Sequence, residues 1–258
     1  MKLNFRDWLF RIWYWYVSNI DKNAEIIFMN YGYSSPDQKV DLDPKEEPNR
    51  YSIQLYHQLA AAVDLKDKSL LEIGSGRGGG LSYIAKNFPI SSAMGVDLNQ
   101  RASNFCSKYY NIKGLSFKQG DAQNLKIEDN SYDAIVNVES SHRYPNMNAF
   151  LGEVKRILKP GGYFLFSDFR YDHEMADIKL DLEKTGFTQI KEEMITPKVV
   201  KALDIDDERK RKLVKRLAPR FLWNIALNFA GTKGSETYQN FASGKYEYFT
   251  YILQKKQD

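Results

Sequence analysis

The segment from residue 72 to 80 is the part of this sequence best suited to hold a ligand, because it is rich in glycine and follows a short apolar run, residues 69–73. Glycine permits positive φ and lets a ligand approach the backbone closely. One spacing of these glycines, G-x-G-x-x-G, is typical of dinucleotide binding. The other, an acid followed by G-x-G-x-G, is typical of S-adenosylmethionine binding. The expected cofactor contacts here are Glu72, Gly74, Ser75, Gly76, Arg77 and Gly78.

Acidic residues around the predicted strands favour S-adenosylmethionine. Asp97 ends the second strand, where its carboxylate can accept hydrogen bonds from both ribose hydroxyls. Asp121 follows the third strand, where a carboxylate can accept from the exocyclic amine of adenine. Glu72 would lie beside the methionine ammonium, whereas it would repel a pyrophosphate. Leu98 and Ala122, which adjoin the two aspartates, are further expected contacts.

Short motifs between about residues 50 and 196 occur in an order typical of one enzyme family. They are the acid with the glycine loop, Asp97, Gly120-Asp121-Ala122, Tyr132-Asp133 before strand four, and Lys159-Pro160-Gly161-Gly162 before strand five. With them, this region resembles the class I S-adenosylmethionine-dependent methyltransferases. The resemblance implies that the glycine loop holds the methionine part, the acid after strand two the ribose, and the acid after strand three the adenine.

Segments outside this shared core carry a narrower resemblance, and they are 28–33, 47–57, 137–145, 163–170 and 234–248. They are similar to the phthiotriolone and phenolphthiotriolone dimycocerosate methyltransferases and their relatives in polyketide and lipid tailoring. Those enzymes O-methylate an oxygen on a long lipid. The resemblance spans nearly the whole chain past residue 28, and it implies a small apolar, lipid or polyketide-like acceptor.

The loop after the fourth strand is expected beside the transferred methyl group. His142 is the predicted general base, because an imidazole with a pKa near ~6.5 can accept a proton at neutral pH. A loop histidine can equally be a structural hydrogen-bond partner. Glu139 is the second catalytic candidate, and it could orient His142, contact the acceptor or bind the methionine ammonium through water. Asn137 and Glu139 are also expected cofactor contacts.

Several other polar side chains have two interpretations each. Tyr31 and Tyr33 lie in a segment that is expected to fold over the cofactor or to pack in the core. Arg77 either bonds the methionine carboxylate or faces solvent. Asp168 could be one Mg²⁺ ligand, but no partner pair accompanies it, so no metal is predicted.

The elements that must position these residues are strands that alternate with helices between about residues 66 and 196. This alternation predicts a Rossmann-like α/β fold with a mostly parallel seven-stranded sheet and helical additions at both ends. A late run, 246–253, is predicted as an antiparallel edge strand. The other readable strands are 69–73, 93–97, 115–119, 132–138 and 163–166. We expect an aromatic helical cap at 1–65 and a methyltransferase domain at 66–258, with a helical insertion at 197–235 that forms part of the acceptor pocket.

Composition excludes several functions. The 258 residues carry a net charge of +4, which is too small a basic excess to suggest nucleic-acid binding. A single cysteine, Cys106, excludes an internal disulfide and a cysteine-based metal cluster. No apolar run approaches the ~20 residues needed to span a bilayer, and the N-terminus lacks a secretory signal pattern. We therefore expect a cytoplasmic protein, with no prediction of its oligomeric state.

The two ends of the chain suggest contact with a membrane surface as one of several interpretations. Apolar residues within 1–20 recur at helical spacing, which fits a lid over the acceptor pocket, a dimer contact or an interfacial helix. The stretch 209–229 is basic and then apolar. It fits a solvated helix with an apolar wall for the acceptor, a contact with anionic lipid, or a contact with RNA.

The sequence therefore predicts methyl transfer to a hydroxyl oxygen by in-line displacement, with His142 as base. N- or C-methylation of a small metabolite is the alternative within the same class. An NAD(P)-dependent oxidoreductase is a further alternative, and Glu72 and Asp121 argue against it. A non-catalytic scaffold that binds S-adenosylmethionine is the remaining alternative. It would need no catalytic side chains in the loop after strand four, whereas this loop contains Glu139 and His142.

Overall fold

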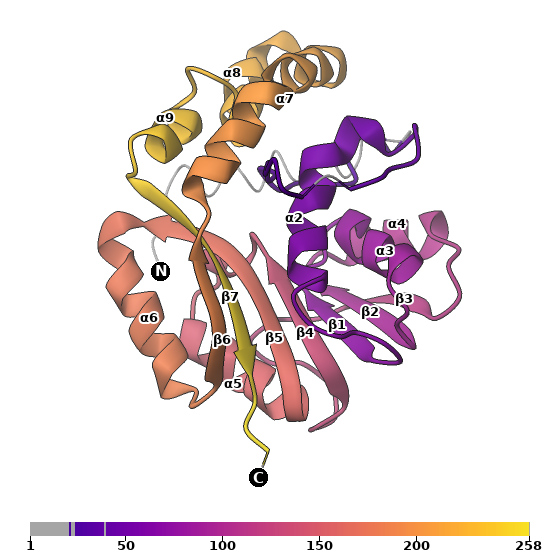
Figure 1. Ribbon diagram of the computed structural model, residues 1–258. Helices are drawn as coiled ribbons and strands as arrows, with labels where there is room; N and C mark the ends of the chain where they lie inside the picture. The colour runs from indigo at the N-terminus through magenta and orange to yellow at the C-terminus, as the bar shows by residue number, and fades with distance from the viewer. Residues whose placement is uncertain (1–20, 22–23, 39, 258) are drawn as a thin grey trace.

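One seven-stranded sheet forms the centre of the protein, with the strand order β3-β2-β1-β4-β5-β7-β6 (Figure 1). The computed structural model describes residues 21, 24–38 and 40–257, and the statements below concern these residues. The strands are β1 Ser69–Ile73, β2 Ser92–Asp97, β3 Leu115–Gln119, β4 Tyr132–Val138, β5 Leu158–Tyr171, β6 Thr188–Met194 and β7 Tyr246–Gln254. The pairs among β1 to β5 are parallel. The predicted Rossmann-like fold with a mostly parallel sheet is confirmed.

The antiparallel strand β7 lies one position inside the sheet rather than at its edge. It pairs with β5 on one side and with β6 on the other, antiparallel to both. The predicted edge position was therefore wrong. Residues 248–253 of β7 are buried on both faces, as an internal strand requires, whereas β6 is polar and largely exposed. The polar strand occupies the edge, where unpaired backbone groups can reach water.

Alternating side chains of the strands divide the core into two apolar layers. In β1, Leu70 belongs to the layer that includes α2 and α3, whereas Leu71 and Ile73 belong to the layer that includes α5 and α6. Figure 1 shows these helices on the two faces of the sheet. The helices are α2 Arg50–Ala60, α3 Gly79–Asn87, α4 Gln100–Tyr109, α5 Met147–Ile157 and α6 Met175–Lys184. Because α2 packs on the sheet, residues 50–60 share the core of the residues that follow 66.

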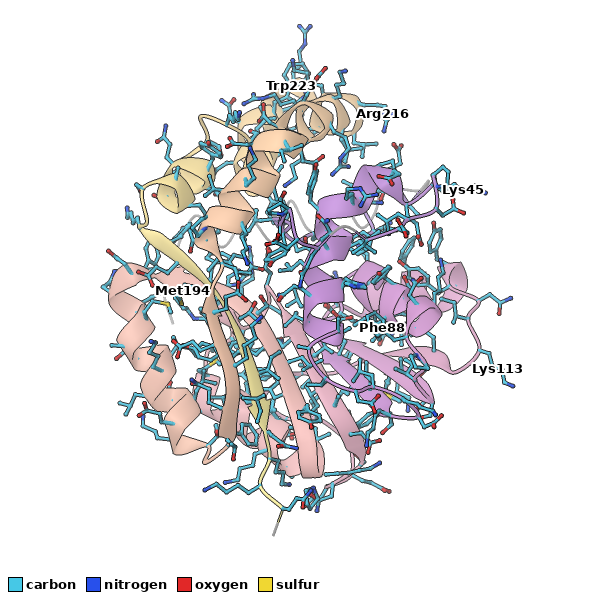
Figure 2. All side chains as sticks on the ribbon, viewed as in Figure 1. Lys45, Phe88, Lys113, Met194, Arg216 and Trp223 are labelled. Atoms are coloured by element: carbon cyan, nitrogen blue, oxygen red, sulfur yellow. The ribbon has the colours of Figure 1, made fainter. Side chains whose placement is uncertain are left out.

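Three further helices form a layer over the carboxyl ends of the parallel strands (Figure 1). They are α7 Thr196–Leu217, α8 Trp223–Phe229 and α9 Glu236–Ala242, with short 3₁₀ turns at Glu47–Asn49, Ser141–Arg143, Asp172–Glu174 and Arg220–Leu222. Arg216 and Trp223 lie at the far end of this layer, away from the sheet (Figure 2). We call the described residues 21 and 24–38 the N-terminal segment. This segment contacts the helical layer, because Ser34 N–H donates to Lys198 O in α7 at 3.1 Å.

The amphipathic helix predicted within 1–20 lies outside the described residues. Within the described part of the chain, no helix is both long and apolar enough to cross a membrane. Strand five is longer than the predicted 163–166, because β5 runs from Leu158 to Tyr171 and includes the Lys159-Pro160-Gly161-Gly162 motif. Gly161 adopts φ +75° there, and the pairing of β4 with β5 shifts register between Tyr132 and Ala134.

Candidate active site

Glu72, the acid before the glycine loop, is fully buried at the end of β1. Its Oε1 accepts a hydrogen bond from the Tyr56 hydroxyl at 2.7 Å, whereas Oε2 has no hydrogen-bond partner among the described residues. Burial raises the pKa of Glu72 to about 8. A buried carboxylate oxygen without a donor is costly, so this position suits a cationic group such as an ammonium.

The glycine loop takes the left-handed backbone that its composition predicts. Gly74, Gly76 and Gly78 have φ values of +79°, +52° and +75°. A Cβ on Gly74 would lie 2.0 Å from Ser140 Oγ and 2.9 Å from the Tyr144 hydroxyl. The glycine at this position therefore allows the loop after β4 to lie directly on the glycine loop.

Asp97 braces the glycine loop from the end of β2. Its Oδ2 accepts from Gly76 N–H at 2.8 Å, and its Oδ1 accepts from Asn99 N–H at 2.8 Å. Burial raises the pKa of Asp97. The next residue, Leu98, is 64% exposed beside it. An exposed leucine next to a fixed carboxylate offers a flat apolar surface and a hydrogen-bond acceptor to one ligand.

The third predicted acid lies in a tight turn at the surface. Asp121 is exposed, and its Oδ1 accepts from Gln123 N–H at 3.0 Å, while Ala122 is buried beneath it. At the centre of the sheet, Asn137 donates from Nδ2 to Ile73 O at 2.7 Å, and its buried Oδ1 has no partner among the described residues.

Arg77 turns inward from the loop. Its Nη2 lies 3.2 Å from Asp21 Oδ2, and both side chains are nearly inaccessible to solvent. The guanidinium also stacks 3.8 Å above the centre of the Phe105 ring. Asp21 in turn accepts from the N–H groups of Glu25 and Ile26, each at 2.8 Å. A contact of Arg77 with a ligand carboxylate stays a prediction, and the buried Nε of Arg77 has no hydrogen-bond partner among the described residues.

Glu139 joins the end of β4 to two distant segments. It has φ +46°, and its Oε1 accepts from Tyr31 N–H and from the Tyr248 hydroxyl, each at 2.7 Å. Burial raises the pKa of Glu139 to about 8. Among the described residues, the Glu139 side chain makes no hydrogen bond to His142, and its contacts hold Tyr31 and β7 in place.

The two predicted tyrosines have different surroundings. The Tyr31 ring packs edge-on against Phe169 and Phe241, with centroids 5.6 and 5.0 Å apart. Tyr33 is only 2% exposed, and its hydroxyl accepts from Lys198 Nζ at 3.0 Å. Tyr31 therefore lies beside Glu139, whereas Tyr33 is packed in the core below α7.

His142 is held by a carboxylate on one side of its ring. Its Nδ1 lies 2.7 Å from Asp168 Oδ1, and its backbone N–H donates to Asp168 Oδ2 at 3.0 Å. Arg143 Nε lies 3.1 Å from Nε2, so the two contacts together assign the proton to Nδ1. Burial lowers the pKa of His142 below its ordinary value. A neutral imidazole with an accepting Nε2 is the form that a general base needs.

Asp168 is fully buried, and the sequence did not identify it as the partner of His142. Burial alone would raise its pKa, but contacts with His142 and Arg170 hold that pKa below its usual range. Ser141 Oγ donates to Asp168 Oδ2 at 2.6 Å. Within the described ranges, no group of three His, Cys, Asp or Glu side chains could hold a metal ion. The contacts of Asp168 with the ring and backbone of His142 place it to orient this imidazole.

A small cavity of about 80 Å³ lies between the N-terminal segment and helices α7 and α8. Its apolar lining is Ile26, Phe28, Met29, Leu213, Val214, Leu217, Ala226, Phe229 and Ala230, and its polar lining includes Glu25, Asn30, Tyr31, Asn49, Ser52, Arg209 and Lys210. The cavity reaches Tyr31, whose N–H is bonded to Glu139. It is therefore adjacent to the predicted site.

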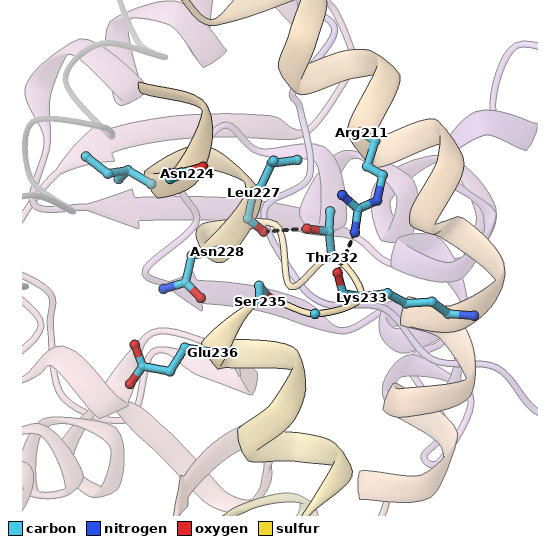
Figure 3. Close-up of a pocket in the computed structure, with 10 residues that line it drawn as sticks. Arg211, Asn224, Leu227, Asn228, Thr232, Lys233, Ser235 and Glu236 are labelled. Carbon is cyan, nitrogen blue, oxygen red and sulfur yellow. Dashed lines mark hydrogen bonds between the residues drawn. The ribbon is translucent and has the colours of Figure 1, made fainter. Parts of the chain in front are cut away.

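A larger cavity of about 460 Å³ lies between α7, α8 and α9 (Figure 3). Arg211 donates to Lys233 O across it, and the Thr232 hydroxyl donates to Leu227 O at 3.1 Å. The residues that line it are Arg211, Asn224, Ile225, Leu227, Asn228, Thr232, Lys233, Gly234, Ser235 and Glu236. None of them belongs to the glycine loop or to the loop after β4.

Comparison with known proteins supports one family. A family model described as "Methyltransferase domain" matches residues 71–166. The chain is 38% identical over 249 residues to a phthiotriol/phenolphthiotriol dimycocerosates methyltransferase of Mycobacterium tuberculosis, and the match covers 95% of this chain and 92% of the relative. This chain belongs to the class I S-adenosylmethionine-dependent methyltransferases. Its cofactor is S-adenosylmethionine, so the predicted enzyme class and cofactor are confirmed.

Two further comparisons are with a second relative in sequence and with a solved structure. The chain is 38% identical over 243 residues to a fatty-acid O-methyltransferase of Mycolicibacterium smegmatis, with 94% of this chain and 88% of the relative covered. A solved structure of a putative sarcosine dimethylglycine methyltransferase from Galdieria sulphuraria matches with a TM-score of 0.73 at 17% identity, covering 97% and 99% of the two chains. At that identity the likeness shows the fold alone.

The residues of this methyltransferase fit its cofactor. Glu72 Oε2 and Asn137 Oδ1 are buried acceptors without a donor among the described residues, and the amino group of S-adenosylmethionine is a donor of the required kind. Asp97 lies at the loop with its carboxylate fixed by two backbone N–H groups. These residues would hold the cofactor at the carboxyl ends of β1 and β2, where ligands of open α/β sheets bind.

Proposed function

We propose that this methyltransferase transfers the methyl group to a hydroxyl oxygen of a lipid or polyketide-like acceptor. S-adenosylmethionine supplies an electrophilic methyl group on a sulfonium. The observation that carries the proposal is the bond between His142 Nδ1 and the buried carboxylate of Asp168. The names of the relatives, which act on phthiotriol lipids and fatty acids, support a lipid as the acceptor.

In this proposal, His142 accepts the hydroxyl proton at Nε2 while the acceptor oxygen attacks the methyl carbon in line with the departing sulfur. Asp168 holds the ring in the required tautomer and stabilises the imidazolium that forms, as a buried carboxylate does in other His-Asp pairs. Arg143, which now donates to Nε2, must yield this position to the hydroxyl. Positioning of the oxygen supplies the remaining rate increase, which reaches roughly 7–11 kcal/mol for well-oriented reactants.

Transfer of a radiolabelled methyl group from S-adenosylmethionine into a fractionated lipid extract tests the proposal. We expect the label in the organic phase and in an alkali-stable ether. Replacement His142→Ala should lower the rate by about 10²- to 10⁴-fold, the usual contribution of a general base, with unchanged affinity for S-adenosylhomocysteine. The matched control is His173→Ala, because His173 is also bonded to an aspartate but is largely exposed.

Four results would count against this assignment. Label confined to protein or RNA would exclude a lipid acceptor. An alkali-labile product would indicate a methyl ester, as the name of the fatty-acid relative suggests, and a methylated nitrogen or carbon would indicate the alternative acceptor classes. A wild-type rate in the His142→Ala protein would show that the imidazole is not the base.

We also propose that the end of the helical layer contacts a membrane surface, from which a lipid acceptor is taken. Phe221 is 81% exposed there, and the charged groups of Lys215 and Arg220 lie 5.9 and 5.7 Å from the Trp223 ring. Exposed aromatic and basic side chains together favour an interfacial contact. The other basic residues of α7 argue for a weak contact, because Arg211 is paired with Asp207 and Arg216 with Glu25.

A further inference from the structure

The small cavity beside Tyr31 is lined by both apolar and polar residues. Its volume of about 80 Å³ is far below the ~300–1,000 Å³ of pockets that enclose a whole ligand. It can therefore hold only one polar group and the first carbons of a chain. Two of its polar lining residues, Asn30 and Lys210, are each more than nine-tenths buried.

Lys210 is a buried ammonium with hydrogen-bonding capacity to spare. It is 8% exposed, and its Nζ donates to Tyr31 O at 3.3 Å. No carboxylate of the described residues lies within ion-pair distance of it, and the nearby Asp206 binds Arg209 through both oxygens, at 2.6 and 2.5 Å. An ammonium has three N–H donors, so Lys210 can serve an acceptor oxygen in the cavity.

Asn30 provides the complementary atom. It is 9% exposed, its Nδ2 donates to Ser52 O at 3.2 Å, and its buried Oδ1 has no hydrogen-bond partner among the described residues. A buried acceptor without a donor costs about 1–3 kcal/mol. A ligand that brings an O–H group to this oxygen would recover that cost.

We propose that Lys210 and Asn30 form a subsite for an alcohol hydroxyl on the aliphatic chain of the acceptor. The hydroxyl accepts from Lys210 and donates to Asn30 Oδ1, a combination that a carboxylate lacks because it only accepts. This hydroxyl is not the one that is methylated, because the Tyr31 backbone separates the two positions. The Tyr31 carbonyl accepts from Lys210 Nζ, whereas the Tyr31 N–H donates to Glu139 Oε1. The inference rests on the proposed function, since it specifies the lipid acceptor.

Calorimetry with a short alcohol tests the subsite without catalysis. The probe is 1-octanol, titrated into the full chain saturated with S-adenosylhomocysteine, with octanoate as the comparison. We expect 1-octanol to bind at least about tenfold more tightly than octanoate, and Lys210→Met to weaken it about tenfold, as for one lost charge-assisted hydrogen bond. The matched control is Lys212→Met, since Lys212 is on the same helix with its side chain 76% exposed.

A second variant tests the subsite even if Lys210→Met does not fold. Asn30→Asp places a carboxylate in the cavity that Lys210 lines, so 1-octanol binding should fall there too. Equal 1-octanol affinity in wild-type and both variants, or no binding to the wild-type chain, would overturn the subsite. Tighter binding of octanoate would reassign it to carboxylates. Because no methyl transfer is measured, failure of the subsite and failure of the proposed function are separate results.

Discussion

At the scale of single residues, Glu72 combines two requirements that oppose each other. Its proposed contact with the cofactor amine requires burial, yet burial without the amine favours its protonated form and raises its pKa to about 8. An unfolded glutamate has a pKa near ~4.3. The folded state therefore binds the proton more tightly, so its stability is greatest below the unfolded value and is lost as the pH rises towards the folded value.

We predict that Glu72→Gln reduces this pH dependence. The fall in melting temperature of the ligand-free protein between pH 5 and pH 8 should become smaller, although Glu139, whose pKa is also raised to about 8, keeps part of it. Affinity for S-adenosylhomocysteine should fall about 10- to 100-fold, as for a lost charge-assisted bond. Glu183→Gln is the control, because Glu183 is exposed. An unchanged affinity would remove Glu72 from the cofactor site.

Single residues also show which parts of the candidate site could be predicted from the sequence and which could not. The glycines, Asp97 and His142 could be singled out because each follows or ends a predicted strand in a recognisable local pattern. The partner of His142 could not, because Asp168 is 26 residues away and its role depends on the pairing of two strands. The pairing of Val138 with Ser167 places Asp168 beside the loop after β4, and an assumed parallel register of strands four and five could have indicated this.

At the scale of elements, the N-terminal segment is fixed to the Rossmann core by buried polar contacts as well as by packing. The ion pair between Arg77 and Asp21 attaches it to the glycine loop, and Glu139 attaches it to β4 through Tyr31. Sequence patterns do not report such contacts, because the paired residues are 56 and 108 positions apart. The sequence left open whether this segment covers the cofactor or packs in the core, and the structure adds how it is held.

We predict that Arg77→Met strongly destabilises the protein, because it leaves the Asp21 carboxylate buried without its cation. Loss of one partner of a buried pair costs about 3–5 kcal/mol, measurable as the free energy of unfolding in a urea titration. The double variant Arg77→Met/Asp21→Asn should lose less than the sum of the two single losses. Additive losses would mean that the two side chains do not stabilise each other.

At the scale of the whole molecule, the alternation of strands and helices was sufficient to predict the class of fold. The starts and ends of β1, β3 and β4 agree with the sequence, because buried strands bounded by polar turns have a strong pattern. The position of β7 was not predictable in the same way. β7 follows three helices in the chain and is inserted between β5 and β6. An apolar run in the sequence does not indicate which strands it will pair with.

The last prediction concerns membrane contact at the outer surface of the helical layer. Phe221→Asp should reduce co-sedimentation with vesicles of phosphatidylcholine and phosphatidylserine, because it removes the most exposed aromatic side chain of the helical layer. Leu180→Asp is the control, since Leu180 is 51% exposed on α6, on the other part of the molecule. Equal sedimentation of both variants and the wild type would mean that this surface does not meet lipid.

The inserted strand β7 also has a consequence for synthesis of the protein on the ribosome. β5 and β6 are made long before β7, and until β7 emerges each of them presents an open strand edge to other chains. Tyr248 of β7 also completes the contacts of Glu139. Chains that end before β7 should therefore be both inactive and prone to aggregation.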